Sequence, residues 1–505
     1  MIMKKTLLSI VFLMLVILCM PAYSQIEIRP RGDVDCNWRV TINDVIVEID
    51  SILCQTKYHS FYNYAFDING DKIINIADVT LIIDALMGQE LPPMPTYSGT
   101  LPVLYINTED HRNIDSKEEY LHAEWWLDAM GIEGYESFGS ANEPLGMEIK
   151  GRGNYTWSLN KKPFRIKLNE KRPLMGMKNN RHFCLLAHAD DQYAKLKNTI
   201  GFELSRRIGL AYTPAQEPVE VVLNGQYIGL YFLTEKIRID KNRVNIEEQE
   251  DEETNPALIT GGWLLEIDNY KNENTIIVKE LNGGNEWYDK IWFTTHSPEV
   301  LSVQQRQYIK QFLETVNAAI YNPCKINNEW EQYIDIDSLA CFYIIGEIMD
   351  NVEHFAGSCY MYKHRGDSTK LIFGPVWDFG ISYLRNIYYP DLTDYNYFIY
   401  QQQTVFHNHW IKEIAMYPHF QFVVRKHWRE FYDSGFNGLD LDKFINDHVN
   451  QIRQAWYCDA KRWSGVNIDR EANRYKNYMF TKIAWLNSKW GVGAHIDPDP
   501  HEYNE

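Results

Sequence analysis

The chain has 505 residues, of which 45% are hydrophobic and 14% aromatic, so it can form large buried cores and is not a disordered polymer. This length leaves room for two to four domains of the usual size, about 100–200 residues each. The formal net charge of −18 argues against nucleic acid as a partner, because phosphate backbones require a basic surface.

Residues 1–24 have the layout of a secretory signal peptide. Lys4 and Lys5 precede an apolar stretch over residues 6–20, and small residues follow up to Ser24. We therefore predict cleavage after Ser24 and a secreted or cell-surface protein without a transmembrane segment in the mature chain. An uncleaved membrane anchor is the alternative, for which the apolar stretch is slightly short.

Two similar segments, which begin at Asp33 and Asp67, follow the signal peptide. Each places side-chain oxygens at positions 1, 3, 5, 9 and 12 of a loop, and each then continues into a helical pattern of apolar residues. Hard divalent cations require this density of oxygen ligands, so two calcium loops are predicted. The expected ligands are Asp33, Asp35, Asn37, Thr41 and Asp44 in the first loop, and Asp67, Asn69, Asp71, Asn75 and Asp78 in the second.

The repeated loops make residues 25–88 similar to a dockerin domain. The resemblance implies a small all-α module that holds Ca²⁺ and binds a cohesin module on a scaffold or cell-surface protein. Trp38 and Lys72 stand at position 6, where glycine is usual, so one site is expected to bind weakly or with altered geometry. Two acidic turns that cap helices are the alternative. Cys36 and Cys54 could pair in an exported protein.

Residues 89–98 contain three prolines and are predicted to be a stiff linker to a large domain over residues 99–490, with a polar tail over 491–505. In that domain "FRIKL" (164–168) alternates like a half-buried strand. The stretch 193–210 has the pattern of an amphipathic helix that ends at Gly209. Residues 219–233 are predicted to be a β-hairpin that turns at Asn224-Gly225.

Five further helices are predicted near 303–321, 338–349, 421–432, 441–456 and 471–489. The second half of the domain is thus more helical than the first. This distribution favours an α+β fold with a strand-rich front lobe and a helix-rich back lobe.

Five motifs in this order resemble the CotH kinase-like family, most clearly over residues 101–383. They are "KGRGNYTW", "KKPFRIKL", "LTEKIRIDKNRVNI", "GGWLLEID" and "FGPVWDFGISY". The resemblance implies an atypical protein-kinase-like, two-lobed fold. It also implies ATP with Mg²⁺ or Mn²⁺ as cofactors, and transfer of phosphate to serine or threonine of extracytoplasmic proteins.

Asp378, in "LIFGPVWDFG", is the expected ligand of the magnesium or manganese ion. An apolar strand is predicted to deliver it, and the resemblance makes it the metal-binding aspartate of the family; a plain turn residue is the alternative. Glu353 is the expected catalytic carboxylate, at a place where many members have aspartate. Gly380 stands where the family often has a second acidic residue.

Other residues are expected to hold the nucleotide. Arg152 lies in a glycine-bearing turn that could approach phosphates, or could be a simple hairpin turn. Lys167, held by Glu203, would contact phosphates in kinase fashion, whereas a lone lysine is more often solvated. Glu235 and Lys236 are implied to line the cleft, and a surface ion pair is the alternative. Arg238 and Arg243 are further possible phosphate contacts.

The departures at positions 353 and 380 leave fewer oxygen ligands for a metal ion and a longer base. They favour an alternative in which the chain is a catalytically degenerate kinase fold, a binding or structural component of a dockerin–cohesin assembly. Transfer of another group from a nucleotide, such as an adenylyl group, is a third hypothesis.

Overall fold

The structure is a computed structural model that describes residues 32–35, 39–54, 68, 74–89, 97–191, 193–281, 290–383, 396–401, 409–463 and 465–492. The expected signal peptide and Cys36 lie outside these residues, as do the side chain of Cys54 and most of the tail. Within the described residues, no helix combines the length and the apolarity needed to cross a membrane.

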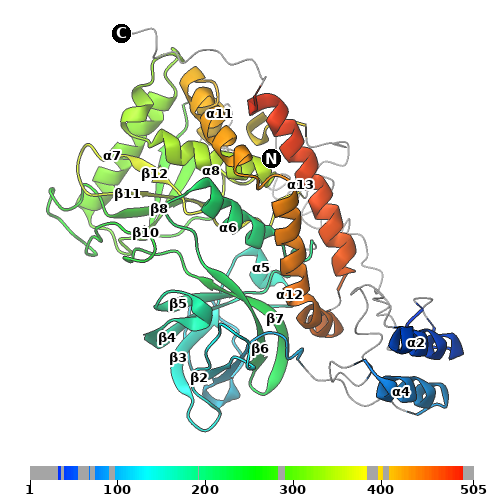
Figure 1. Cartoon of the computed structure of the whole chain (residues 1–505). Coiled ribbons are helices and arrows are strands. Elements are labelled where there is room, and N and C mark those ends of the chain that lie inside the picture. The colour runs from blue at the N-terminus through cyan, green and yellow to red at the C-terminus, as the bar shows by residue number, and fades with distance from the viewer. Residues whose placement is uncertain are drawn as a thin grey trace, which may run out of the picture.

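A closed seven-stranded barrel follows the linker (Figure 1). Its strands pair in the order β1-β2-β3-β4-β5-β7-β6, and β1 closes the barrel by pairing in parallel with β6. The strands are β1 (Val103–Thr108), β2 (Leu121–Asp128), β3 (Leu145–Gly151), β4 (Phe164–Arg172), β5 (Asn180–Leu186), β6 (Gln216–Leu223) and β7 (Gln226–Glu235). The one-turn helix α5 (Tyr155–Ser158) lies between β3 and β4.

The barrel forms because its strands alternate between an apolar interior and a polar exterior. In β4, Phe164, Ile166 and Leu168 are buried in the barrel core, while Arg165 and Lys167 face outward, as predicted. The hairpin of β6 and β7 is also confirmed. Asn224 and Gly225 both have positive φ, 50° and 75°, as a tight hairpin turn requires.

A second, antiparallel sheet lies next to the barrel, with strand order β12-β11-β8-β10-β9 (Figure 1). Helix α7 packs against β9, and α8 packs against β12. The strands are β8 (Trp263–Ile267), β9 (Thr275–Lys279), β10 (Lys290–Ser297), β11 (Cys359–Lys363) and β12 (Leu371–Phe373).

Helices make up most of the rest of the domain and share one large apolar core with the second sheet. They are α6 (Lys197–Ile208), α7 (Val303–Ile320), α8 (Ile336–Ile348), α10 (Ile411–Ile414), α11 (Pro418–Asp433), α12 (Leu439–Trp463) and α13 (Ile468–Trp490), with the 3-10 helices η1 (Glu109–His111), η2 (Leu174–Gly176), η3 (Glu329–Gln332) and η4 (Ile399–Gln401). All six predicted helices are confirmed, and α12 extends beyond its predicted end to Trp463.

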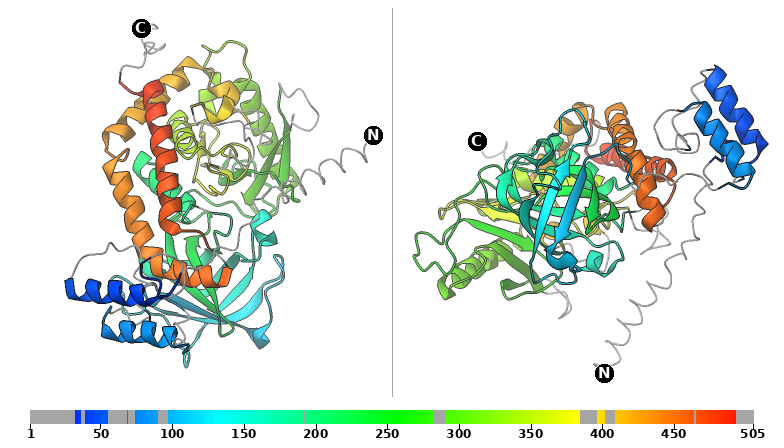
Figure 2. Two further views of the ribbon diagram at one scale, coloured as in Figure 1. Left: turned by 90° about the vertical axis from the view of Figure 1, so that its right-hand side faces the viewer. Right: turned by 90° about the horizontal axis from the view of Figure 1, so that it is seen from below.

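Helix α12 runs from the helical part down to the barrel and packs on β7 (Figures 1 and 2). The contact is polar and buried. The Lys161 Nζ donates to the Asp459 carboxylate at 2.6 Å and to the Leu230 carbonyl, while Asp459 also accepts from the Leu230 N–H at 2.9 Å. Asp459 thus accepts a backbone hydrogen bond from β7 that a carbonyl of a neighbouring strand would otherwise accept.

The predicted α+β class therefore holds, with strands gathered in the first half and helices in the second. The strand-rich front part is a closed barrel. The kinase-like, two-lobed arrangement stays a prediction.

Near the N-terminus, α2 (Ile42–Cys54) and α4 (Ile76–Leu86) pack side by side as a small separate pair (Figures 1 and 2). Their core consists of Val34, Val45, Ile68, Val79 and Ile82. Val34 and Ile68 are separated by the same interval as Val45 and Val79, so the sequence repeat produces a repeated core.

Candidate nucleotide and metal site

Asp378 is presented by an irregular segment. The predicted apolar strand is shorter than expected: β12 ends at Phe373, and residues 374–377, which belong to no helix or strand, lead to Asp378. Asp378 itself has a φ of 58°, in the left-handed region that residues other than glycine seldom adopt. Backbone strain of this kind persists only where the surroundings enforce it, and it concentrates at functional sites.

Helix α6 holds this strained turn in place. The Asn198 Oδ1 accepts the Phe379 N–H at 2.9 Å, and the Lys197 Nζ donates to the Gly380 carbonyl at 2.5 Å. The Phe379 ring lies directly on Gly201, where a Cβ would be only 2.1 Å from a ring carbon. Glycine is therefore required at this position of α6 for the turn to approach the helix.

Asn351 connects Asp378 with the segment that carries Glu353. Its Nδ2 donates to the Asp378 carbonyl at 3.3 Å, and its Oδ1 accepts the Glu353 N–H at 3.3 Å. The Glu353 carboxylate in turn accepts a 2.5 Å bond from Asn269. The two carboxylates that the sequence singled out are thus brought into one site.

Further carboxylates surround these two, and their mutual repulsion changes their acidity. Although the Asp378 side chain is exposed to solvent, desolvation by the surrounding protein and the charge of Asp190 raise its pKa. Burial and the charge of Asp378 raise the pKa of Glu353 to about 8, with smaller contributions from Asp268 and Glu266. A bound cation would favour the ionised form of carboxylates whose pKa values are raised in this way.

A basic pocket lies beside the acidic group, between the barrel and the second sheet. In a chain with a net charge of −18, its lining contains five lysine and arginine side chains. Aromatic and apolar side chains complete the walls, and the Arg152 guanidinium lies over the Trp377 ring at 5.6 Å. The lining is Lys117, Lys150, Gly151, Arg152, Gly153, Asn154, Arg165, Cys184, Lys236, Ile237, His296, Tyr360 and Trp377.

The cations of this pocket are close enough to perturb one another. Burial lowers the pKa of Lys236 to about 8, and the neighbouring charge of Arg165 adds to the effect. Burial and Arg165 also lower the pKa of Lys150. Among the described residues, the buried Nε of Arg165 has no hydrogen-bond partner. An anion bound here would satisfy that donor and relieve the repulsion.

The pocket continues into a second hollow that shares Arg165, Lys236, Ile237 and His296 with it. Their volumes are about 250 and 380 Å³. Together they reach the size of sites that bind drug-sized molecules. The second hollow also includes Arg238 and the carboxylates of Glu248, Glu250, Asp251 and Glu299.

Two of the predicted nucleotide contacts therefore line the pocket, Arg152 and Lys236. Lys167 does not line it, and it is not held by Glu203. Its Nζ pairs instead with Glu148 on β3 at 2.6 Å, on a partly exposed face of the barrel. Glu203 pairs with Arg206 and Arg207 of its own helix. The expected Lys167–Glu203 pair is wrong because β4 and α6 present these side chains to different neighbours.

Glu235 also lies outside the pocket lining. Its carboxylate binds the buried Arg243 guanidinium at 2.5 Å and accepts from Tyr212 and the Ala215 N–H. Arg243 additionally pairs with Asp240 and donates to the Lys178 and Asn179 carbonyls, so both of its terminal nitrogens are used within the fold. Both residues stabilise the end of β7, so neither is placed to contact phosphate.

Sequence reasoning missed several residues of the site. The alternation of "FRIKL" puts Arg165 on the same outward face as Lys167, and this pattern alone does not distinguish the two as pocket residues. Glu266, in the motif "GGWLLEID", accepts a 2.5 Å bond from the pocket residue His296. Asp190 carried no signal in the sequence beyond an Asp-Asp pair before a helix.

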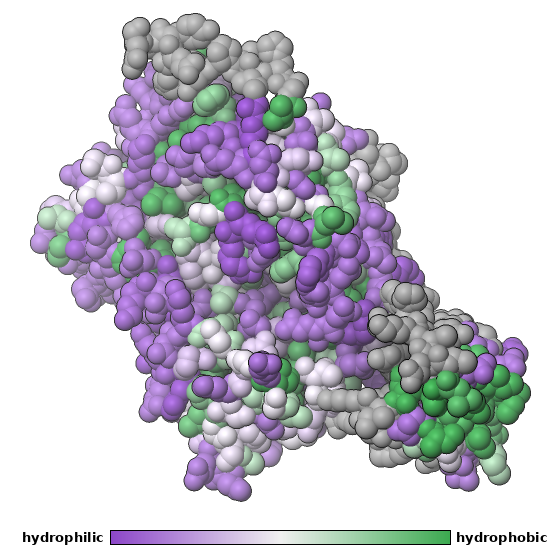
Figure 3. Space-filling view, viewed as in Figure 1, coloured by the Kyte–Doolittle hydropathy of each residue, from purple (hydrophilic) through white to green (hydrophobic). Residues whose placement is uncertain are grey.

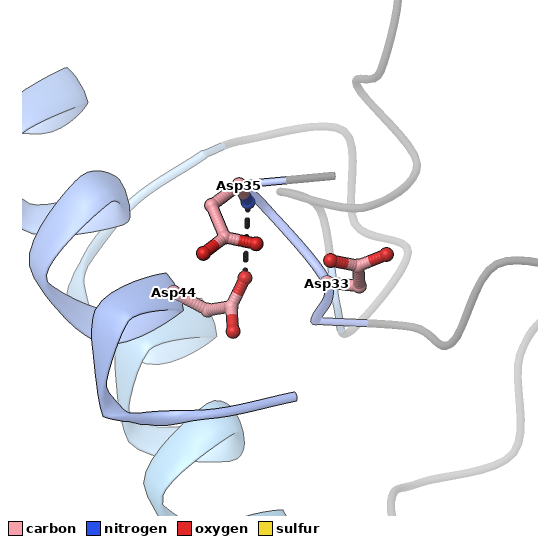
Figure 4. Close-up of side chains that lie close together, drawn as sticks. All are labelled: Asp33, Asp35 and Asp44. Carbon is pink, nitrogen blue, oxygen red and sulfur yellow. Dashed lines mark hydrogen bonds between the residues drawn. The ribbon is translucent and has the colours of Figure 1, made fainter. Parts of the chain in front are cut away.

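The first predicted calcium loop brings its acidic residues together (Figure 4). Ligand atoms of Asp33, Asp35 and Asp44 all lie within 4.8 Å of one another. Asp44 also organises the loop, since its carboxylate accepts from the Val34, Asp35 and Thr41 N–H groups at 2.7–3.0 Å. Three carboxylates at this separation suit a hard cation that binds oxygen.

The second loop repeats part of this arrangement. The Asp78 carboxylate accepts from the Ile68 N–H at 2.8 Å and the Asn75 N–H at 3.0 Å, and Asn75 caps α4. Asn37, Asp67, Asn69 and Asp71 lie outside the described residues. The two loops therefore use their position-12 aspartates in the same way.

Comparison with known proteins agrees with the large domain. A profile of the family described as CotH kinase protein matches residues 149–486, from β3 to α13, about two thirds of the chain. The chain therefore belongs to the CotH kinase family, and this membership indicates a kinase-like function. No curated protein matches the chain.

Proposed function

We propose that this chain is an exported kinase that transfers phosphate from ATP to serine or threonine of extracytoplasmic proteins. The observation that carries the proposal is that a group of basic side chains lies next to a group of acidic side chains. A pocket with five cations adjoins the carboxylates of Asp378, Glu353 and Asp190. Phosphoryl transfer requires cations on the phosphates and carboxylates for a metal ion and for the incoming hydroxyl.

Arg152, Lys236 and Arg165 would hold the phosphates, and Arg165 has a buried donor left over for this purpose. Trp377 and Tyr360 offer flat surfaces for the rest of the nucleotide. Lys167, Glu203 and Glu235 are left out of this assignment because their charges are used elsewhere.

Asp378 would hold Mg²⁺ or Mn²⁺, and the residues present suit such an ion. Asp190 and Asp378 converge at Gly380, and among the described residues neither forms an ion pair with a basic side chain within 4.0 Å. The ion would neutralise charge on the phosphate oxygens. Glu353, positioned by Asn269 and Asn351, would accept the proton of the acceptor hydroxyl.

A catalytically degenerate binding protein is the second candidate. It is favoured by Gly380, which supplies no carboxylate, and by the raised pKa of Glu353, about 8, which keeps much of this residue protonated at neutral pH. In that case the same pocket would bind a nucleotide without transfer.

We further propose that the front pair of helices is a dockerin that holds Ca²⁺ and attaches the chain to a cohesin module outside the cell. Ile42 and Leu53 on α2 and Ile76 and Met87 in or next to α4 are more than 60% exposed. These two pairs occupy equivalent positions of the repeat. They contribute to the apolar surface that Figure 3 shows over this pair of helices, in contrast to the mostly hydrophilic large domain. Exposed apolar patches of this kind mark interaction sites.

The kinase proposal is tested with the purified full-length chain, labelled ATP and Mg²⁺ or Mn²⁺, with casein as a generic acceptor and calorimetry for ATP affinity. Asp378→Asn should lower transfer by about 100-fold or more. Arg165→Met should weaken ATP binding about 10-fold, as expected for the loss of one charge-assisted contact. Lys167→Met, two residues along the same strand, is the matched control and should leave affinity within about 2-fold, because Lys167 does not line the pocket and pairs with Glu148 instead.

The outcomes separate the candidates. ATP binding that requires Arg165 but yields no transfer to casein or to the chain itself identifies the degenerate binding protein. Absence of ATP binding, or equal effects of the Arg165 and Lys167 variants, removes the nucleotide pocket and both candidates with it.

A further inference from the structure

We infer that Asp190 is the second carboxylate ligand of the divalent cation at Asp378, and that it supplies from the β5–α6 connection what position 380 lacks. This inference rests on the proposed metal site. It assigns the second ligand of that site to a residue from a different part of the chain.

The first observation is the convergence of the two carboxylates at Gly380. The position that a Cβ on Gly380 would occupy is 2.9 Å from the Asp190 Oδ2 and 3.1 Å from the Asp378 Oδ1. Carboxylate oxygens from residues 188 positions apart therefore approach one small volume beside a residue with no side chain. A side chain at position 380 would fill this volume, so a carboxylate at 380 and the carboxylate of Asp190 compete for one place.

The second observation is that, in the part of the chain that the structure describes, no basic side chain forms an ion pair with either carboxylate within 4.0 Å. The Lys197 Nζ, the nearest basic candidate on α6, donates to the Gly380 carbonyl instead. Among the described residues, no hydrogen bond or ion pair engages the Asp190 side chain. The Asp190 Oδ2 and the Asp378 Oδ1 lie 2.9 and 3.1 Å from the same point beside Gly380, so the two negative charges repel each other. Two close carboxylates without a counter-ion are unfavourable until a cation lies between them.

The neighbouring Asp191 shows what a purely structural aspartate does in the same segment. Its carboxylate accepts the Tyr193 N–H at 2.7 Å and the Lys197 N–H at 3.0 Å, so it fixes the start of α6. This anchoring keeps Asp190 next to the 378–380 turn. The same turn is hydrogen-bonded to α6 through Asn198. Asp191 is therefore used by the fold, and Asp190 is presented to the site.

The test measures Mn²⁺ binding to the full-length chain, by electron paramagnetic resonance of free Mn²⁺ and by the thermal shift that Mn²⁺ induces. All proteins carry Asp44→Asn and Asp78→Asn, so that the front loops do not contribute. Asp190→Asn should weaken Mn²⁺ binding about 10-fold or more, because affinity follows the number of charged ligands. Without metal, the same variant should be at least as heat-stable as its parent, since it removes a repulsion.

The decisive variant combines Asp190→Ala, which vacates the shared volume, with Gly380→Asp. It should restore Mn²⁺ affinity to within about 3-fold of the parent, because the new carboxylate enters the same volume. Glu203→Gln, at a carboxylate of α6 that pairs with Arg206 and Arg207 of the same helix, is the control and should leave Mn²⁺ affinity unchanged. If Asp378→Asn abolishes binding while Asp190→Asn does not weaken it, or if the double variant fails to regain affinity, the inference is overturned and the metal site at Asp378 remains. A parent that binds no Mn²⁺ overturns the proposed metal site together with the inference.

Discussion

At the scale of single residues, Glu353 shows how crowding of carboxylates in the site affects the stability of the chain. Its pKa is raised to about 8 by burial and by Asp378, from an ordinary value of 4.5. The folded chain therefore binds more protons at this position than the unfolded chain between pH 4.5 and 8. By linkage, this group makes the free energy of unfolding fall as the pH rises through that interval.

Glu353→Gln should remove this dependence. In EDTA, the melting temperature of the variant should exceed that of the unmodified chain by about 1–2 °C at pH 8.5 and by less at pH 5, because the charge that repels Asp378 is absent. Thermal denaturation across pH 5–9 measures the difference. Glu203→Gln, at a partly buried carboxylate that pairs with Arg206 and Arg207 of its own helix, serves as the control. A difference in melting temperature between Glu353→Gln and the unmodified chain that does not vary with pH contradicts the assignment of this pKa.

At the scale of elements, the contact between α6 and the 378–380 turn decides where Asp378 points. Gly201 allows the Phe379 ring to reach the helix, and Asn198 fixes the backbone beside it. Glycine inside a helix costs about 1 kcal/mol relative to alanine, so the contact must offset that cost.

Gly201→Ala should therefore destabilise the chain although alanine is the better helix former. The new Cβ would lie 2.1 Å from the Phe379 ring, an overpacking whose typical cost is about 1–3 kcal/mol. Urea denaturation gives the change in the free energy of unfolding, and ATP-dependent transfer should fall with it. Combining Gly201→Ala with Phe379→Leu should recover part of both losses; a stabilising effect of Gly201→Ala alone is the result that refutes the contact.

Comparison of β4 with the site shows what sequence can and cannot supply at this scale. Strand alternation, the Asn-Gly turn and the helix ends are local, and each was predictable from a few neighbouring residues. The choice between Arg165 and Lys167 was not, because both face outward from the barrel, and only the position of the second sheet, around His296 and Tyr360, decides which one lines the pocket.

The carboxylates of the site were only partly predictable, because only some of them belong to local sequence motifs. Motifs pointed to Asp378 and Glu353, which act within a short stretch of chain. Asp190 and Glu266 join them through long-range packing that no local pattern records.

At the scale of the whole molecule, the front pair of helices is the smallest unit and has only five buried apolar residues in its described core. Cores of this size seldom stabilise a domain without a metal ion or other cross-link. The carboxylates of Asp33, Asp35 and Asp44 would repel one another without a cation (Figure 4).

Removal of calcium should therefore release this region and leave the large domain folded. Limited proteolysis of the full chain with mass-spectrometric mapping should give cleavage within residues 32–89 in EDTA and protection in Ca²⁺. Asp44→Ala with Asp78→Ala should abolish the protection, whereas Asp50→Ala, at an exposed position of α2, should retain it. Equal cleavage with and without Ca²⁺ argues against the calcium loops.

The link between Lys161 and Asp459 has a consequence for the order in which the protein can mature. The two partners are 298 residues apart, so a ribosome delivers the lysine long before the aspartate that balances it. Until α12 has emerged, Lys161 lacks its carboxylate partner and the Leu230 N–H lacks its acceptor. The barrel therefore gains these contacts only when α12, within the last 67 residues of the chain, has been made, and a chain that stops before Leu439 should be cleaved by proteases more readily than the full-length protein.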